Sequence, residues 1–167
     1  MIARLMVMAL LLFATPVVAQ TPGVDSGAPI EIEADKLEVR QDKQLAIFTG
    51  NVVAIQGGMT LKTNEMRVTY RQDGKSGGAG VGGAISRLEA LGAVVINTDK
   101  ETATGERGVY DVDGRVIDLQ GNVQLSNKDG RLTGQALRMD LASGVTTLAA
   151  PSSGRVRGVF TPQKQSN

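Results

Sequence analysis

The chain of 167 residues contains no cysteine, no histidine and no tryptophan, and each absence excludes a class of chemistry. Without cysteine it has neither a disulfide nor a thiolate nucleophile. Without histidine it lacks the side chain that most often serves as general base or zinc ligand near neutral pH. We therefore expect a protein that is not an enzyme, with no catalytic residue, no metal site and no cofactor.

Aromatic residues and excess charge are also scarce. Three Phe and two Tyr make up 3% of the chain, which is too few for the stacking surfaces that bind single-stranded nucleic acids. The 18 basic and 17 acidic residues are scattered, and no basic patch is present that would neutralise a phosphate backbone. We expect no nucleic-acid partner.

The longest apolar run lies at the start of the chain. A short basic segment is followed by ten apolar residues at positions 5–14, and Val17 and Ala19 are compact residues before a cleavage point. Ten residues span only ~15 Å as a helix, about half of a bilayer core. The pattern predicts a signal peptide, residues 1–19, cleaved after Ala19, which leaves 17 basic and 17 acidic residues. An uncleaved membrane anchor is the alternative.

Two stretches that lie 71 residues apart follow one pattern. Residues 42–52 align without gaps with residues 113–123, and the register extends to Arg67 and Arg138. Repeated units stack and share one core, so the repeat indicates a long β-structure. The two Gly-Asn pairs in the repeat predict equivalent hairpin turns in two halves, joined by a glycine-rich loop at residues 74–84.

The rest of the chain alternates apolar and polar residues, as Ile30, Ile32 and Ala34 do with the acidic residues between them. This period of two is typical of antiparallel strands with one buried and one wet face. Only residues 84–91 offer a short helical pattern. Turn signals recur about every 8–12 residues, among them Gln56–Gly58, Asp73-Gly74, Asp113-Gly114, Asp129-Gly130 and Ser143-Gly144. We predict a flexible leader at residues 20–29, a β-domain at 30–150 and a polar tail at 151–167.

Three polar patterns resemble functional motifs, but each favours a simpler interpretation. Residues 78–83 match G-x-G-x-x-G without the strand and helix that a dinucleotide site requires, which favours a loop. Asp111–Gly114 begins like a calcium loop but lacks the closing glutamate, which favours a polar hairpin turn. Glu31, Glu33 and Asp35 have no aromatic cleft around them, which favours a solvated strand face.

The apolar face carries more information than these polar patterns. Its residues are mostly Ile, Val, Leu and Met, with few large rings. Such a face forms either a packed core or an interior open to acyl chains, because each buried CH₂ contributes ~0.8 kcal/mol without directional demands. The residues alone leave both alternatives open.

Several segments resemble the LptA/OstA family, the periplasmic lipopolysaccharide-transport proteins of Gram-negative bacteria. They are Pro29–Asp35, Phe48–Val52, Gln56-Gly57, Leu61–Val68 and Leu119–Val123, within a likeness that covers about residues 29–148. The resemblance implies an all-β fold, a twisted open-ended β-jelly roll of about 14–16 antiparallel strands. It implies a periplasmic protein that binds lipopolysaccharide and carries it from the inner to the outer membrane.

The resemblance also implies where ligand and partners bind. Lipid A acyl chains would lie inside the roll against Ile30, Ile32, Val95, Tyr110 and Val112. An inner-membrane transporter component would meet the N-terminal edge, with Ile30–Asp35 as candidate, and an outer-membrane translocon component the C-terminal edge, with residues 145–149 or 155–160 as candidates. Head-to-tail self-association is expected from the same edges. The rival hypotheses are a membrane-anchored inner-membrane component of the same pathway, a ligand-free β-solenoid scaffold, and a carbohydrate-active enzyme.

Overall fold

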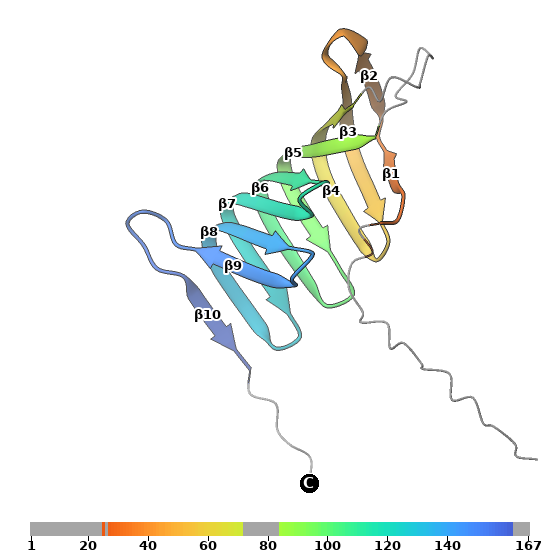
Figure 1. Cartoon of the computed structure of the whole chain (residues 1–167). Coiled ribbons are helices and arrows are strands. Elements are labelled where there is room, and N and C mark those ends of the chain that lie inside the picture. Colours follow the sequence, from red (N-terminus) through yellow and green to blue (C-terminus); the bar gives the residue numbers. More distant parts are fainter. Residues whose placement is uncertain (1–24, 26, 72–83, 162–167) are drawn as a thin grey trace, which may run out of the picture.

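The computed structural model describes residues 25, 27–71 and 84–161, which form one antiparallel sheet of ten strands with a single short 3-10 helix. The strands are β1 (Ile30–Glu33), β2 (Lys36–Arg40), β3 (Leu45–Gln56), β4 (Met59–Tyr70), β5 (Ile85–Asn97), β6 (Glu101–Asp111), β7 (Val116–Asn127), β8 (Gly130–Asp140), β9 (Val145–Ala149) and β10 (Arg157–Phe160). The short helix η1 (Gln41–Lys43) joins β2 to β3. Strands β3 to β8 lie side by side in sequence order, with β1 and β2 at one end of the row and β9 and β10 at the other (Figure 1).

Each long strand bends near its middle, so the sheet folds into two layers. At the N-terminal end, β2 pairs with the first half of β3 and β1 pairs with the second half. At the C-terminal end, β9 pairs with the second half of β8 and β10 with the first half. Layer A therefore runs from β2 to β9 and layer B from β1 to β10. Counted by halves, the six bent and four short strands make sixteen segments, so the predicted jelly-roll class is confirmed.

The bends are β-bulges, and three of them have the same backbone conformation. In β3, β5 and β7, two successive residues with positive φ stand where the pairing register shifts. These pairs are Gly50-Asn51, Gly92-Ala93 and Gly121-Asn122. The prediction that the Gly-Asn pairs are hairpin turns is therefore wrong. Two successive left-handed residues suit a type I′ turn and a bulge equally, and here the strand continues beyond them.

The two copies of the sequence repeat form equivalent bends, one in β3 and one in β7. The Asn51 Nδ2 donates to Asp35 Oδ2 over 2.8 Å, and the Asn122 Nδ2 donates to Glu106 Oε1 over 2.5 Å. Each pair spans 16 residues of sequence, and the two pairs lie 71 residues apart. We call this hydrogen bond between an asparagine and the carboxylate on the neighbouring segment the bend clasp.

The turns before β3 and β7 repeat in the same way. Gln44 and Arg115 both have left-handed φ values, of 50° and 52°. Their carbonyl oxygens accept from the amides of Tyr70 over 3.1 Å and Leu141 over 2.9 Å. The 71-residue period therefore fixes both the turn that starts a strand pair and the bulge that bends it.

The apolar side chains of both layers point inward and form one core. The fully buried members include Val52, Met66, Val94, Ile96, Ile117, Leu119, Val123 and Leu137. On the outer faces the alternating residues are polar and exposed, as the acidic residues Glu31 and Glu33 of β1 are. The predicted solvated face of β1 is therefore confirmed.

Other local predictions had mixed outcomes. The turns at Gln56–Gly58 and Ser143-Gly144 connect strands as predicted, whereas residues 84–91, predicted as a helical pattern, mostly form the start of β5. Arg157–Phe160 lies in the predicted polar tail but forms β10. Asp73-Gly74 and the G-x-G-x-x-G match lie outside the described residues. Within the described part of the chain, no helix is long and apolar enough to cross a membrane.

Candidate functional site

The apolar interior reaches both ends of the roll. At the N-terminal end, Ile30 and Ile32 of β1 pack against the buried cluster, and at the C-terminal end Leu148 of β9 does so. All three side chains are only partly buried, because no further strand from the described part of the chain covers the ends. The interior is therefore a single apolar path bounded by edge strands.

Between these ends the interior is closely packed. A cavity of about 20 Å³ remains near the N-terminal end, lined in part by Ile30, Leu61, Leu88 and Tyr110. That is space for about one water molecule and far less than an acyl chain requires. A chain that enters must therefore separate the two layers.

The side of the roll opposite the bends is hollowed. There a groove of about 330 Å³ lies between the hairpins of the two layers. Its apolar lining comes from Met59 and Ile96 of layer B and from Met139 and Leu141 of layer A. Its polar lining comes from Asp99, Lys100, Glu101 and Asp140. We call this groove the mouth, since it joins an apolar interior to solvent past polar side chains.

Two carboxyl groups at the mouth have shifted pKa values. Burial raises the pKa of Glu101, and the nearby charge of Lys100 opposes this effect. Hydrogen bonds from the backbone amides of Ser143 and Ala142 lower the pKa of Asp140. Asp140 therefore holds the turn between β8 and β9 in place as a carboxylate, which fixes one wall of the mouth.

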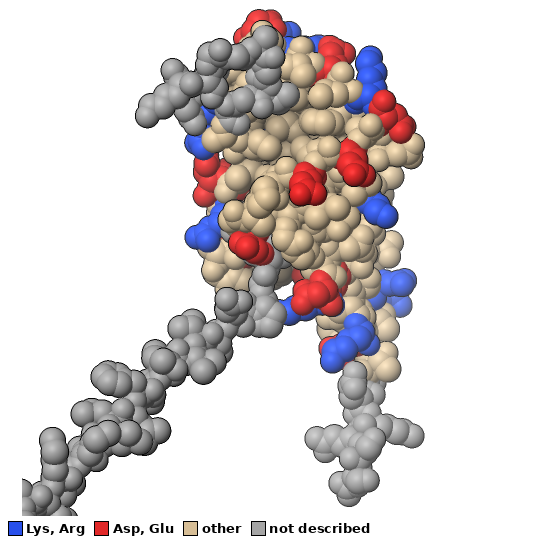
Figure 2. Space-filling model, turned by 90° about the vertical axis from the view of Figure 1, so that its right-hand side faces the viewer, with Lys and Arg blue, Asp and Glu red and all other residues tan. Residues whose placement is uncertain are grey.

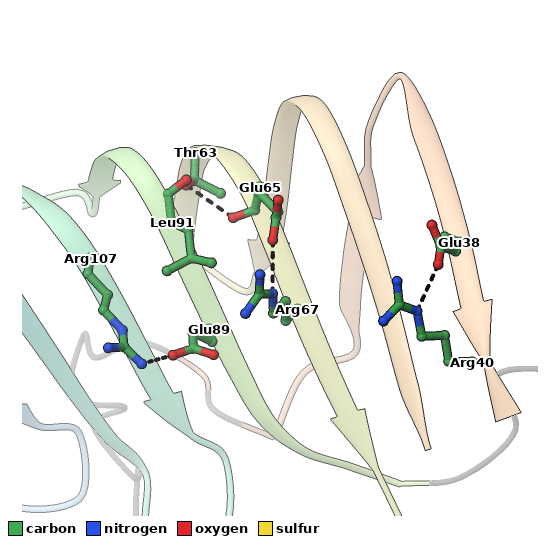
Figure 3. Close-up of polar contacts among 8 residues, drawn as sticks. All are labelled: Glu38, Arg40, Thr63, Glu65, Arg67, Glu89, Leu91 and Arg107. Atoms are coloured by element: carbon green, nitrogen blue, oxygen red, sulfur yellow. Dashed lines mark hydrogen bonds and ion pairs between the residues drawn. The ribbon is translucent and has the colours of Figure 1, made fainter. Parts of the chain in front are cut away.

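The outer face of layer A is polar in contrast to the interior. Ion pairs lie along it between Glu38 and Arg40, between Glu65 and Arg67, and between Glu89 and Arg107 (Figure 3). Exposed pairs of this kind contribute about 0–1 kcal/mol each. Their effect is to keep this face solvated, so an apolar ligand is directed to the inner face.

A threonine at the bend of β4 contributes a polar contact inside the roll. The Oγ1 of Thr63 lies 2.9 Å from the carbonyl oxygen of Gly92, 3.0 Å from that of Leu91 and 3.3 Å from that of Glu65. Its hydroxyl donates to one of these at a time. Thr63 thus supplies a hydrogen-bond donor where the pairing register between β4 and β5 shifts (Figure 3).

The structure places four of the five predicted lipid-binding residues on the inner side. Tyr110 is buried in the core, and Ile30, Ile32 and Val112 pack against it. Ile30 and Tyr110 line the same small cavity. Whether these residues contact lipid stays a prediction.

The inward orientation predicted for Val95 is wrong. Val94 and Ile96, on either side of it, are each 1% exposed in the core, and Val95 is paired with the exposed Lys62 of β4. Val95 therefore lies on the outer face of layer B. Three consecutive apolar residues give no alternation at this point, so the sequence does not decide which of them faces inward.

Further residues line the interior that the sequence analysis did not select. Gln56, Met59, Leu61 and Leu88 surround the small cavity. The inward position of Gln56 could have been found from the alternation in β3, because Gln56 follows Val52 and Ala54 at alternate positions of that strand. No sequence pattern indicates the mouth, since the strands that form it are distant in sequence.

The calcium-like motif forms a turn. Asp111 Oδ1 accepts from the amide of Gly114 over 2.8 Å. Both oxygens of Asp113 accept from the guanidinium of Arg71, over 2.7 and 3.0 Å. These contacts agree with the predicted polar turn, and no group of metal-binding side chains occurs among the described residues.

Exposed apolar side chains gather at the edge strands. In the described residues, the large exposed ones other than Ile55 are Leu37 and Val39 on β2, Val145 on β9, and Val156, Val159 and Phe160 on or beside β10. Phe160 is 70% exposed. Unpaired backbone groups beside apolar side chains favour addition of another strand.

A sequence profile of the family described as the LptA/LptD N-terminal domain lipopolysaccharide transport protein matches residues 31–145. The chain belongs to this family. The match includes β3 to β8 and therefore the whole two-layer core. This membership confirms the resemblance seen in the sequence and assigns the chain to transport proteins rather than to an enzyme family.

Individual relatives agree with this assignment. An uncharacterised protein of Rhizobium meliloti is 36% identical over 138 residues, which is 82% of this chain and 73% of that protein. The lipopolysaccharide export system protein LptA of Haemophilus influenzae is 25% identical over 84% of this chain and 81% of its own length. The crystal structure of LptH from Pseudomonas aeruginosa, described as the LptA homologous periplasmic component of the lipopolysaccharide transport device, has a TM-score of 0.70 at 16% identity, over 83% of this chain and 99% of that one.

Proposed function

We propose that the protein is a periplasmic carrier that binds lipopolysaccharide by its acyl chains and forms part of a bridge from the inner to the outer membrane. The observation that carries this proposal is the apolar interior that extends from Ile32 of β1 to Leu148 of β9, between two ends where the described residues add no further strand. Membership of a family of lipopolysaccharide transport proteins supports the choice of ligand. Residues 1–19 would act as the cleaved signal peptide that exports the chain.

The mouth supports an amphipathic ligand. Acyl chains would pass between Met59 and Met139 into the interior as the layers separate, and the sugar head group would stay at the polar lining. Methionine suits this position because its unbranched, flexible side chain repacks around different shapes. No nucleotide is required in this scheme, since the carrier only holds the lipid that its partners deliver and remove.

The two ends of the roll fit each other by strand direction. Every pairing from β1 to β10 in layer B and from β2 to β9 in layer A is antiparallel. Each layer contains an even number of strands, so its two edge strands run in opposite directions. The edge strand β10 of one copy can therefore pair antiparallel with β1 of the next. In the proposed bridge this geometry permits head-to-tail copies, with an inner-membrane component at β1 and β2 and an outer-membrane component at β9 and β10.

Charge also matches across such a junction. One row of paired residues on the outer face of layer B begins at Glu33 of β1 and ends at Arg157 of β10. A second copy stacked in register would place its Glu33 beside this arginine. Figure 2, which shows the side of the molecule where β1 and β2 lie, has acidic side chains across the middle of the face and basic ones mainly at its margins.

Charge reversal at these positions is expected to control self-association. Arg157→Glu alone, or Glu33→Lys alone, should lower the association constant by about tenfold, because like charges meet at the junction. Both substitutions in one chain should restore it. Sedimentation velocity measures the association, and Lys62→Glu, which reverses an exposed charge in the middle of the same row, serves as the control. Equal association of all variants would contradict the proposed junction.

Lipid binding itself is tested at β1. Ile32→Asp should weaken lipopolysaccharide binding by at least about tenfold, because an isolated carboxylate at the apolar end of the path is costly to desolvate. Val95→Asp places the same group on the outer face and should leave binding within about twofold. Binding is measured by displacement of a fluorescent lipid, with circular dichroism to show that each variant is folded. Equal binding by Ile32→Asp and the native protein would refute the proposed site.

A further inference from the structure

One polar atom inside the apolar interior has no hydrogen bond to another described residue. Tyr110 is only 3% exposed, and its hydroxyl oxygen is fully buried without a hydrogen-bond partner in the described part of the chain. Leaving a buried hydroxyl unsatisfied costs about 1–3 kcal/mol. A phenylalanine would fill the same space without this cost, so the hydroxyl is a candidate for a contact that forms only when a ligand is present.

The hydroxyl of Tyr110 stays protonated and can donate. Burial raises the pKa of Tyr110 above its ordinary value, and the nearby side chain of Gln56 and the charge of Arg115 act in the opposite direction. The side chain of Gln56 lines the same cavity and lies close to the hydroxyl, whose oxygen has no hydrogen bond to a described residue. Its Nε2 donates instead to the carbonyl oxygen of Ala28 over 3.0 Å, which holds the amide group in place.

The surroundings of Tyr110 and Gln56 are otherwise apolar. Both line the small cavity, whose other walls include Leu61, Met66 and Leu88. Met59 lines both this cavity and the mouth, so its flexible side chain lies between the two. An acyl chain that displaces Met59 would therefore arrive directly beside the tyrosine hydroxyl and the glutamine amide.

We infer that Tyr110 and Gln56 form a polar subsite that selects acyl chains bearing a hydroxyl substituent along the chain, such as a 3-hydroxyl. The inference rests on the proposed lipid-binding function and specifies the class of chain that the interior prefers. An oxygen on the chain accepts from the Tyr110 hydroxyl and so removes the unsatisfied donor. A plain hydrocarbon chain fills the same space but leaves the donor buried, which makes it the weaker ligand.

The test compares two synthetic ligands on the full chain. They are a glucosamine carrying two 3-hydroxytetradecanoyl chains and the same sugar carrying two tetradecanoyl chains. We expect the native protein to bind the hydroxylated ligand about fivefold more tightly, and we expect Tyr110→Phe to lose this preference. Tyr70→Phe removes the hydroxyl of the only other tyrosine and should keep the preference. The melting temperature of ligand-free Tyr110→Phe should be equal to or above that of the native protein, which shows that the fold is intact.

The possible outcomes separate the subsite from the function on which it rests. Loss of the preference in Tyr110→Phe, with its retention in Tyr70→Phe, supports the subsite. A preference that persists in Tyr110→Phe overturns it, and so does equal binding of both ligands by the native protein, although lipid binding itself would then stand. If the native protein binds neither ligand, the proposed function fails and the subsite fails with it.

Discussion

Replacing Gly121 by alanine is expected to lower the free energy of unfolding by about 3 kcal/mol, because the residue meets two separate costs at the bend of β7. Its φ of +81° lies in the left-handed region that side chains with a Cβ disfavour. A Cβ built there would also lie 2.5 Å from Glu106 Oε2 and 2.7 Å from Glu106 Cβ. The close approach arises because Glu106 is the acceptor of the bend clasp.

A matched control separates the two costs. Gly144, in the turn between β8 and β9, has a similar φ of +72°, but a Cβ at that position would have no atom within 4 Å. Gly144→Ala should therefore cost only about 1 kcal/mol, from backbone strain alone. Urea denaturation followed by circular dichroism measures both variants. Equal losses in the two variants would show that the close contact at the bend contributes nothing.

The outcome for Gly121 bears on function because the bends shape the interior. Without the bulges in β3, β5 and β7 the sheet would have no reason to fold into two layers, and no interior would form between them. Gly50 repeats the arrangement at β3, where a Cβ would lie 2.4 Å from Asp35 Oδ2. The repeat found in the sequence therefore encodes curvature, and the same clasp is used at both positions.

Much of the fold follows from the period of two. In β3 and β7 the apolar residues on each side of the Gly-Asn pair keep their phase, from Ala46 to Ala54 and from Ile117 to Leu125. In β7 this alternation indicates which residues face the core. In β3 apolar residues stand on both faces, and the alternating series that ends in Val53 and Ile55 proves to be the outer one, since Ile55 is 41% exposed. The same alternation did not distinguish a hairpin turn from a bulge, since Gly-Asn supplies the left-handed residues for either one.

The candidate site was less predictable than the fold. The outward position of Val95 depends on its pairing with Lys62, and the sequence does not specify that register. The mouth brings Met59 of layer B near Met139 of layer A, two residues 80 positions apart that meet only because the sheet folds over itself. The buried hydroxyl of Tyr110 likewise depends on which polar groups reach it, which is a property of packing.

The outward-facing Val95 provides a control for the proposal that lipopolysaccharide lies between the layers. Ile32 and Tyr110 lie on the inner side, and Val95 lies on the outer face of the same sheet. A photoreactive benzoylphenylalanine at each position reports on atoms within a few ångströms of it. Because the layers enclose mainly apolar side chains, an adduct from the inner side requires that the lipid has entered the roll.

Photo-crosslinking in cells that are exporting lipopolysaccharide is the most direct test. We expect lipopolysaccharide adducts from Ile32 and Tyr110 and at most a background level from Val95. The difference on an immunoblot should be about tenfold or more, because a ligand enclosed between the layers does not reach the outer face. Adducts of equal intensity from Val95, or none from the two inner positions while transport is active, would contradict it.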